Sequence, residues 1–129
     1  MTEIVLDSSA VLALMRREPG ADAVASVLPG ALLGMVNLAE VVTKLCERGL
    51  AVDVARYAVA SLGVRIAEFT EEQAHLVGEL RPLTRSAGLS LGDRACLALG
   101  KISGATVLTA EGVWPQIASV AGVEIRLIR

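Results

Sequence analysis

The chain has 129 residues, of which 53% are hydrophobic, and its 12 basic and 14 acidic residues give a net charge of −2. This length fits a single domain over residues 1–129, and this much apolar material excludes an intrinsically disordered chain. Because only 2% of the residues are aromatic, the sequence offers little support for the base-stacking surfaces of OB-folds and RRM domains.

Short apolar runs alternate with amphipathic segments in the first half of the chain. Residues 4–6 and 31–36 are apolar runs that predict two buried strands. The spacing of Leu38, Val41, Val42 and Leu45 predicts a helix with one face in the core. The helices expected in this half run from the cap Asp7-Ser8-Ser9 to about Met15, over residues 21–28, from about residue 38 to Gly49, and over residues 51–62.

The second half of the chain repeats this alternation. Thr70 and Gln73 have the spacing of a capping box, which predicts a helix that Pro82 should kink or end before Gly88. A helix from Ser90 through residue 102 is apolar on most sides, so we expect it to be buried. The remaining expected elements are strands over residues 64–69 and 106–108, a short helix over residues 114–121, and an edge strand over residues 123–127.

Strands that alternate with helices predict an α/β fold, a three-layer α/β/α sandwich around a mostly parallel sheet of about four to five strands. Ligands of such sheets bind beyond the carboxyl ends of the strands. Asp7 follows the first strand and Glu111 follows a later one, so we expect these carboxylates at one edge. Taken singly, Asp7 is also explained as a helix N-cap, and Glu111 as a solvated surface residue.

Two further acids lie on predicted helices. Glu40 lies opposite the apolar stripe of its helix, where an exposed i, i+4 pair with Lys44 is the simpler explanation. Asp93 lies in an almost entirely apolar helix, and a buried carboxylate needs a partner. Ser90 and Asp93 also fit a capping box in which Asp replaces the usual Glu. Each acid therefore has a structural explanation beside a chemical one.

Converging carboxylates without His or Cys ligands describe a site for Mg²⁺ or Mn²⁺. Such an ion lowers the pKa of its bound water and neutralises charge on a phosphoryl group, which is the chemistry of phosphodiester hydrolysis. A Ser/His/Asp triad has less support, because the one histidine, His75, lies in a charged helical segment. The sequence has no glycine-rich phosphate-binding loop either.

Four blocks of sequence, in the same order, resemble the PIN-domain family, and within it the VapC-type toxins. The resemblance covers about residues 3 to 128, and the ordered set of blocks is more specific than any one of them. The blocks are Val5-Leu6-Asp7-Ser8-Ser9-Ala10, Asn37-Leu38-Ala39-Glu40, Leu89-Ser90-Leu91-Gly92-Asp93-Arg94-Ala95-Cys96-Leu97-Ala98-Leu99 and Val107-Leu108-Thr109-Ala110-Glu111.

The resemblance implies an α/β/α fold and an endoribonuclease that depends on Mg²⁺ or Mn²⁺. Asp7, Glu40 and Asp93 match the three main active-site acids of the family. Asp7 and Asp93 are then expected to ligate the metal directly, and Glu40 directly or through water. Ser9 matches a hydroxyl position that steadies the site by hydrogen bonding. Glu111 stands where the family usually has a fourth Asp, and its extra methylene leaves both ligation and a water-bridged role open.

The resemblance also implies in-line attack of water on an RNA phosphate, leaving 5′-phosphate and 3′-hydroxyl ends. It implies a homodimer and a VapB-type antitoxin that inserts a segment into the acidic groove. Two other interpretations stay open: a non-catalytic PIN-like module that binds protein or RNA, and a nuclease that acts on DNA or structured RNA. The arginines considered as contacts for the RNA backbone are Arg16, Arg17, Arg85 and Arg94.

The two cysteines, Cys46 and Cys96, lie in apolar helical patterns without neighbours at metal-ligand spacing, so we expect buried free thiols. No apolar run reaches the ~18 residues of a membrane helix, and no signal segment opens the chain. We therefore expect a cytoplasmic protein without membrane contact.

Overall fold

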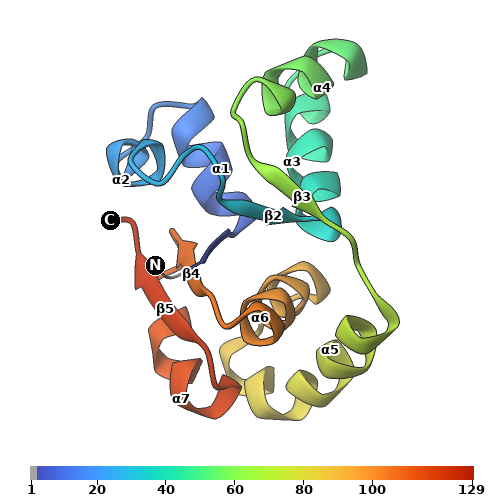
Figure 1. Ribbon diagram of the computed structural model, residues 1–129, viewed down its shortest axis with the longest axis vertical. Helices are drawn as coiled ribbons and strands as arrows, with labels where there is room; N and C mark the ends of the chain where they lie inside the picture. The colour runs from blue at the N-terminus through green and yellow to red at the C-terminus, as the bar shows by residue number, and fades with distance from the viewer. Residues whose placement is uncertain (1–2) are drawn as a thin grey trace.

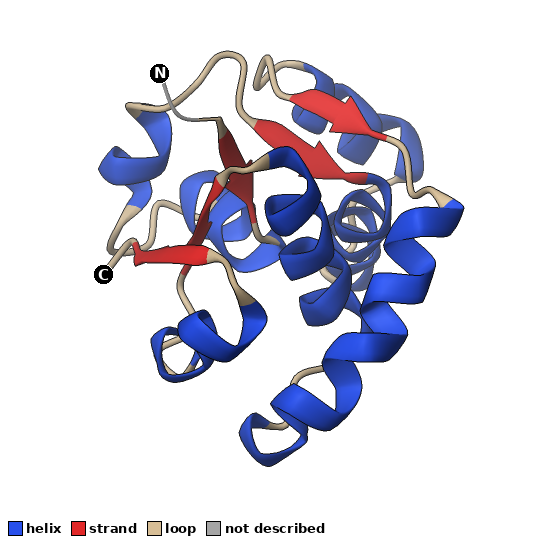
Figure 2. Ribbon diagram, turned by 60° about the horizontal axis from the view of Figure 1, so that its bottom comes forward, coloured by secondary structure: helices blue, strands red, loops and turns tan. Residues whose placement is uncertain are grey.

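The computed structural model describes residues 3–129 and contains one parallel sheet of five strands, in the order β3-β2-β1-β4-β5 (Figure 1). The predicted three-layer α/β fold is confirmed, because helices cover both faces of this sheet (Figure 2). The strands are β1 (Ile4–Leu6), β2 (Leu32–Gly34), β3 (Arg65–Ala67), β4 (Thr106–Thr109) and β5 (Glu124–Leu127).

The helical segments connect the parallel strands by crossovers, as parallel pairing requires. Their bounds agree with the sequence prediction to within a few residues. The α-helices are α1 (Ser8–Met15), α2 (Ala21–Ala25), α3 (Met35–Glu47), α4 (Val52–Ala60), α5 (Glu71–Thr84), α6 (Leu91–Ser103) and α7 (Ala118–Ala121). Two short 3₁₀ helices are η1 (Arg85–Ala87) and η2 (Trp114–Ile117).

Consecutive residues of the central strand pack into different cores. Val5 and Leu6 are both fully buried, because successive side chains of a strand point to opposite faces. Val5 belongs to the cluster with the buried residues of α5, α6 and η2. Leu6 belongs to the cluster with those of α1, α3 and α4. A strand buried on both faces is fixed in position, so the residue that follows β1 is also fixed.

One local prediction needs correction. The strand expected over residues 31–36 ends at Gly34, because α3 already begins at Met35. The helix that Pro82 was expected to kink or end before Gly88 does end before it, at Thr84, two residues beyond the proline. Pro82 lacks the N–H that would bond the carbonyl of Gly78. Gly78 is exposed, so water can satisfy that carbonyl and the helix tolerates the proline.

The prediction of two buried thiols is half right. Cys96 is buried in α6, and burial raises its pKa well above the ordinary value for a thiol. Cys46 is exposed, because the buried positions of α3 are Asn37, Val41 and Leu45, and the next residue along points to solvent. Within residues 3–129, no helix combines the length and apolar character needed to cross a membrane.

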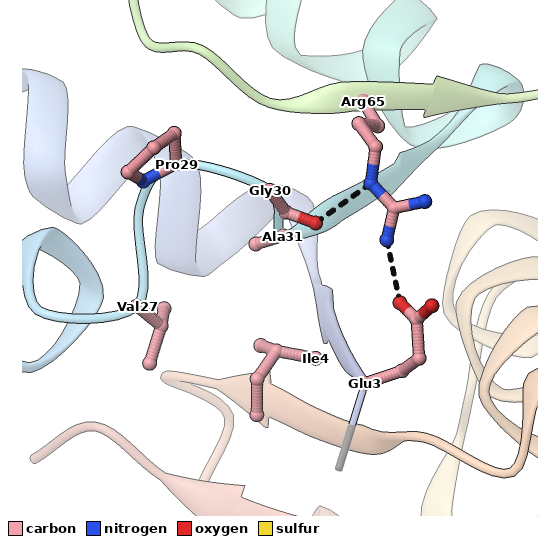
Figure 3. Close-up of a pocket in the computed structure, with 7 residues that line it drawn as sticks. All are labelled: Glu3, Ile4, Val27, Pro29, Gly30, Ala31 and Arg65. Carbon is pink, nitrogen blue, oxygen red and sulfur yellow. Dashed lines mark hydrogen bonds and ion pairs between the residues drawn. The ribbon is translucent and has the colours of Figure 1, made fainter. Parts of the chain in front are cut away.

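The amino edge of the sheet carries a cavity of about 320 Å³ that an ion pair spans (Figure 3). Arg65, at the start of β3, donates from Nη2 to Oε2 of Glu3 at 2.6 Å and from Nε to the carbonyl of Gly30 at 2.9 Å. Both side chains of the pair remain about half exposed. The charges at this edge are therefore partnered and in contact with water.

Candidate active site at the carboxyl edge of the sheet

The sheet and its flanking helices bring all four predicted acids to the opposite, carboxyl edge, and three of them near one another. Asp7 follows β1, Glu40 lies in the second turn of α3, and Asp93 lies in the first turn of α6. The charges of Asp93 and Glu40 both raise the pKa of Asp7, which requires the three carboxylates to be near one another. Glu111 follows β4 at this edge as well, but it is exposed.

Asp7 is the most deeply buried of these acids, with only 1% of its surface exposed. Its Oδ2 accepts hydrogen bonds from the hydroxyls of Ser9 at 2.6 Å and Thr109 at 3.0 Å. Its Oδ1 is buried and has no hydrogen-bond partner in the described chain. Burial raises the pKa of Asp7 from 3.8 to about 6, and the two hydroxyls reduce this effect. Asp7 precedes α1 but makes no capping hydrogen bond, so the N-cap interpretation of its side chain is wrong.

The hydroxyls of Ser9 and Thr109 are aimed at Asp7 by backbone groups. The N–H of Ala110 donates to Ser9 Oγ at 3.0 Å, and the N–H of Glu111 donates to Thr109 Oγ1 at 3.0 Å. Because each hydroxyl oxygen already accepts from the backbone, its own proton is free to point at the carboxylate. Ser9 was predicted to have this role, whereas Thr109 was missed. The sequence feature that could have revealed Thr109 is a polar residue at the end of β4, the strand that pairs with β1.

Glu40 is held in place from two sides. Its Oε1 accepts from Ser8 Oγ at 3.0 Å and from Asn37 Nδ2 at 2.9 Å, and the same amide donates to the carbonyl of Gly92 at 3.1 Å. A Cβ at Gly92 would overlap the carboxylate of Glu40, so only glycine leaves room for it. The expected exposed pair with Lys44 does not form, since none of the ion pairs among residues 3–129 involves Glu40.

The predicted capping box at the start of α6 is confirmed. The N–H of Ser90 donates to Asp93 Oδ2 at 2.8 Å, and the N–H of Asp93 donates to Ser90 Oγ at 3.1 Å. The side chain of Asp93 is half-buried, and the box uses only one of its carboxylate oxygens. The structural and chemical explanations of Asp93 are therefore compatible, because Oδ1 is left for another ligand.

The oxygen atoms at this edge are of the kind that Mg²⁺ and Mn²⁺ prefer. The unpartnered, buried Oδ1 of Asp7 is the atom that most needs a cation, since a buried carboxylate without one is costly. Among residues 3–129, no three His, Cys, Asp or Glu side chains lie close enough together to enclose a metal ion. Mg²⁺ usually takes one or two carboxylates and keeps several waters, so the residues present fit such an ion.

The four arginines considered as RNA contacts have different surroundings. Arg94 donates from Nη1 to the carbonyl of Val77 at 3.0 Å and so joins α6 to α5. Arg17 and Arg85 are exposed, whereas Arg16 is half-buried at the end of α1. His75, which has no role in the site, is exposed beside Glu71, in the charged helical segment where the sequence places it.

The sequence matches the family model described as PIN domain over residues 4–120. No curated protein matches the chain. DNA-bound VapBC from Salmonella typhimurium has a similar fold, with 15% identity, 100% of each chain covered and a TM-score of 0.76. VapBC-1 from nontypeable Haemophilus influenzae has 16% identity, 97% of each chain covered and a TM-score of 0.74.

A third similar structure is VapC20 from Mycobacterium tuberculosis, described as a Sarcin-Ricin loop cleaving toxin. It is 22% identical, the match covers 94% of this chain and 96% of that chain, and the TM-score is 0.74. At these identities the structural matches establish that the fold is shared.

Proposed function

Because the chain belongs to the PIN domain family, we propose that it is an endoribonuclease that uses Mg²⁺ or Mn²⁺ to hydrolyse RNA phosphodiester bonds. The observation that carries the proposal is the buried, unpartnered Oδ1 of Asp7, with Glu40 and Asp93 near it. Three carboxylates at one edge repel one another unless a cation lies among them. A divalent ion removes this repulsion and attracts a phosphate to the same place.

The residues of the site have separate tasks in this proposal. Asp7 and Asp93 hold the ion directly, and Glu40 holds it directly or through a water. Ser9 fixes the carboxylate of Asp7 by its 2.6 Å hydrogen bond. When bound, the ion supplies a nucleophilic water and neutralises charge on the phosphate. Glu111 acts at the same edge, as a ligand or through a water.

We further propose that the chain is the toxin of a type II toxin–antitoxin pair and acts in the cytoplasm as one PIN domain over residues 1–129. Two of the similar structures are named as VapBC assemblies, and VapC20 is named as a toxin that cleaves the Sarcin-Ricin loop. By analogy, the partner is a VapB-type antitoxin bound to a homodimer. A basic residue of that antitoxin would meet the acidic site and compete with the metal and RNA.

Cleavage of a mixed RNA pool by the purified protein tests the proposal. We expect cutting with Mg²⁺ or Mn²⁺, none with EDTA, and a loss of about 100-fold or more in Asp7→Asn and Asp93→Asn, since even changes to residues behind metal ligands cost about 10 to 100-fold. Both variants keep the size of the side chain, so circular dichroism should show a folded protein. Full activity in either variant would refute the assignment.

Glu111 needs its own pair of variants, because its side chain is exposed. If its carboxylate reaches the ion, Glu111→Asp raises cleavage and Glu111→Gln lowers it. Equal activity of both variants and the wild type would identify Glu111 as a surface residue.

A non-catalytic binding module is the second candidate function, and one observation favours it: no three acids of residues 3–129 enclose a metal. Thermal unfolding with Mn²⁺ separates the two, because an ion that binds only the folded state raises the midpoint. A rise that is lost in Asp7→Asn supports the nuclease. No rise at millimolar Mn²⁺ supports the module.

A further inference from the structure

A groove leads away from the acidic site between α1 and α3. It consists of two adjoining depressions of about 520 and 300 Å³ that share Leu12, Lys44 and Glu47 as lining residues. The larger one reaches Glu40 and Gly92, at the candidate active site. The smaller one ends at Arg16 and Arg48, the residues that close α1 and α3. The groove therefore connects Glu40, at the edge of the acidic site, to a basic end.

Two matched rows of side chains form the walls of this groove. Residues four apart in a helix lie on the same face, one turn above the other. On α1 the row is Ser8, Leu12, Arg16, and on α3 it is Glu40, Lys44, Arg48. At 1.5 Å per residue, Lys44 lies about 6 Å and Arg48 about 12 Å along the axis from Glu40. Both rows thus run from the active-site end to a cation.

The cations of the groove are not neutralised by carboxylates of the protein. None of the ion pairs within the described part of the chain involves Arg16, Lys44 or Arg48, and Glu47 between them is unpaired as well. The Nε of Arg16 is buried and has no hydrogen-bond acceptor. A buried guanidinium N–H without an acceptor is costly, so this end of the groove favours an anionic ligand.

We propose that this groove binds the phosphate backbone of a single RNA strand whose scissile phosphate lies at the acidic site, with Arg16, Lys44 and Arg48 contacting the phosphates on one side of the cut. The inference rests on the proposed function. An RNA strand suits the groove because its phosphates are continuous with the bond to be cut. The three cations lie along one groove, on its two walls, and a single groove follows one strand rather than the two backbones of a duplex.

The salt dependence of RNA binding tests the proposal. The probe is a fluorescein-labelled oligouridine of about 12 nucleotides, bound by the Asp7→Asn protein with Mg²⁺ so that the strand stays intact. For single strands, each phosphate contact contributes about 0.7 to the slope of log Kd against log salt concentration. We expect Lys44→Ala and Arg48→Ala each to lower the slope by about 0.7, and the double variant by about 1.4.

Arg126→Ala is the matched control, because it removes the same charge from β5, outside the groove, and should leave the slope unchanged. Arg16 is half-buried, so Arg16→Lys, which keeps the charge, accompanies Arg16→Ala. The slope should fall in Arg16→Ala and recover in Arg16→Lys.

Slopes equal to that of Arg126→Ala in all groove variants would overturn the proposal, whether or not the wild type cleaves RNA. If the groove variants bind RNA unchanged but release a labelled acidic peptide, the groove binds a protein partner and the proposal is overturned. Lowered slopes in the groove variants, together with a wild type that does not cleave RNA, would refute the proposed nuclease and leave the groove as an RNA-binding site.

Discussion

The carboxylates at the two edges of the sheet have opposite electrostatic environments. At the amino edge, Glu3 lies 2.6 Å from Arg65, and both side chains are about half exposed (Figure 3). At the carboxyl edge, Asp7 is almost fully buried, receives only hydroxyl donors, and has the carboxylates of Glu40 and Asp93 as its charged neighbours. The carboxylate at the amino edge has a basic partner, whereas no ion pair among residues 3–129 involves Asp7, Glu40 or Asp93.

The different environments of the carboxylates at the two edges indicate which edge of this sheet favours a ligand. An exposed ion pair such as Glu3 and Arg65 contributes ~0–1 kcal/mol and needs no ligand. Buried like charges lower stability and are kept where an outside cation or substrate makes use of them. The contrast therefore favours the carboxyl edge over the cavity at the amino edge as the place where a cation binds.

The largest expected effect comes from removing the buried charge at the carboxyl edge. With EDTA, Asp7→Asn should be more stable than the wild type at pH 7 by up to ~3 kcal/mol, the free energy that corresponds to a pKa of about 6 in place of 3.8. The amide nitrogen of Asn can occupy the position of the unpartnered Oδ1. Urea unfolding measures the difference.

The sign of the pH dependence follows from the raised pKa of Asp7. Between about pH 4 and pH 6 the folded protein keeps a proton on Asp7 that the unfolded chain has released. The wild type should therefore lose stability relative to Asp7→Asn as the pH rises through this window, and the gap should stay constant above it. If the free energy of unfolding of the two proteins differed by a constant amount from pH 4 to 7, the raised pKa of Asp7 would be contradicted.

The next prediction changes the position of a carboxylate at the same edge and leaves its charge unchanged. Gly92→Ala places a Cβ where the carboxylate of Glu40 lies, so Glu40 must leave Ser8 and Asn37. Since the carboxylate of Glu40 is the flexible end of its side chain, we expect the stability of the fold to be nearly unchanged. Cleavage should be reduced by about 10 to 100-fold.

Gly78→Ala is the control for this substitution, because a Cβ there meets nothing within 4 Å. It should keep full activity and add about 0.5–1 kcal/mol of stability, since alanine is the better helix former. Wild-type cleavage by Gly92→Ala would show that the observed position of Glu40 is not needed.

The smallest effect is expected at the amino edge. Glu3→Gln removes the charge from an exposed pair, so the free energy of unfolding should fall by at most ~1 kcal/mol. Cleavage should be unchanged, because the pair lies at the opposite edge from Asp7. A loss of activity comparable to that of Gly92→Ala would abolish the contrast between the edges.

The sequence was sufficient to predict the fold and to place the acids at one edge of the sheet, but not to find the groups that hold them. The apolar runs that became β1 and β4 predicted both the sheet and the position of Asp7 after β1. Thr109 was missed because it binds an atom 102 residues away, and the bond from Asn37 to the carbonyl of Gly92 likewise joins residues 55 apart in sequence. Exposure of Cys46 was missed because an apolar helical pattern does not fix which neighbouring residue faces the core.

The strand order also determines when the site exists during synthesis of the chain. β1 lies between β2 and β4, so its second neighbour is supplied by residues 106–109. A nascent chain that ends after α4 holds Asp7 and Glu40 but lacks Asp93 and the hydroxyl of Thr109. The cluster around Asp7 and the five-stranded sheet are thus completed together, late in the synthesis of the chain.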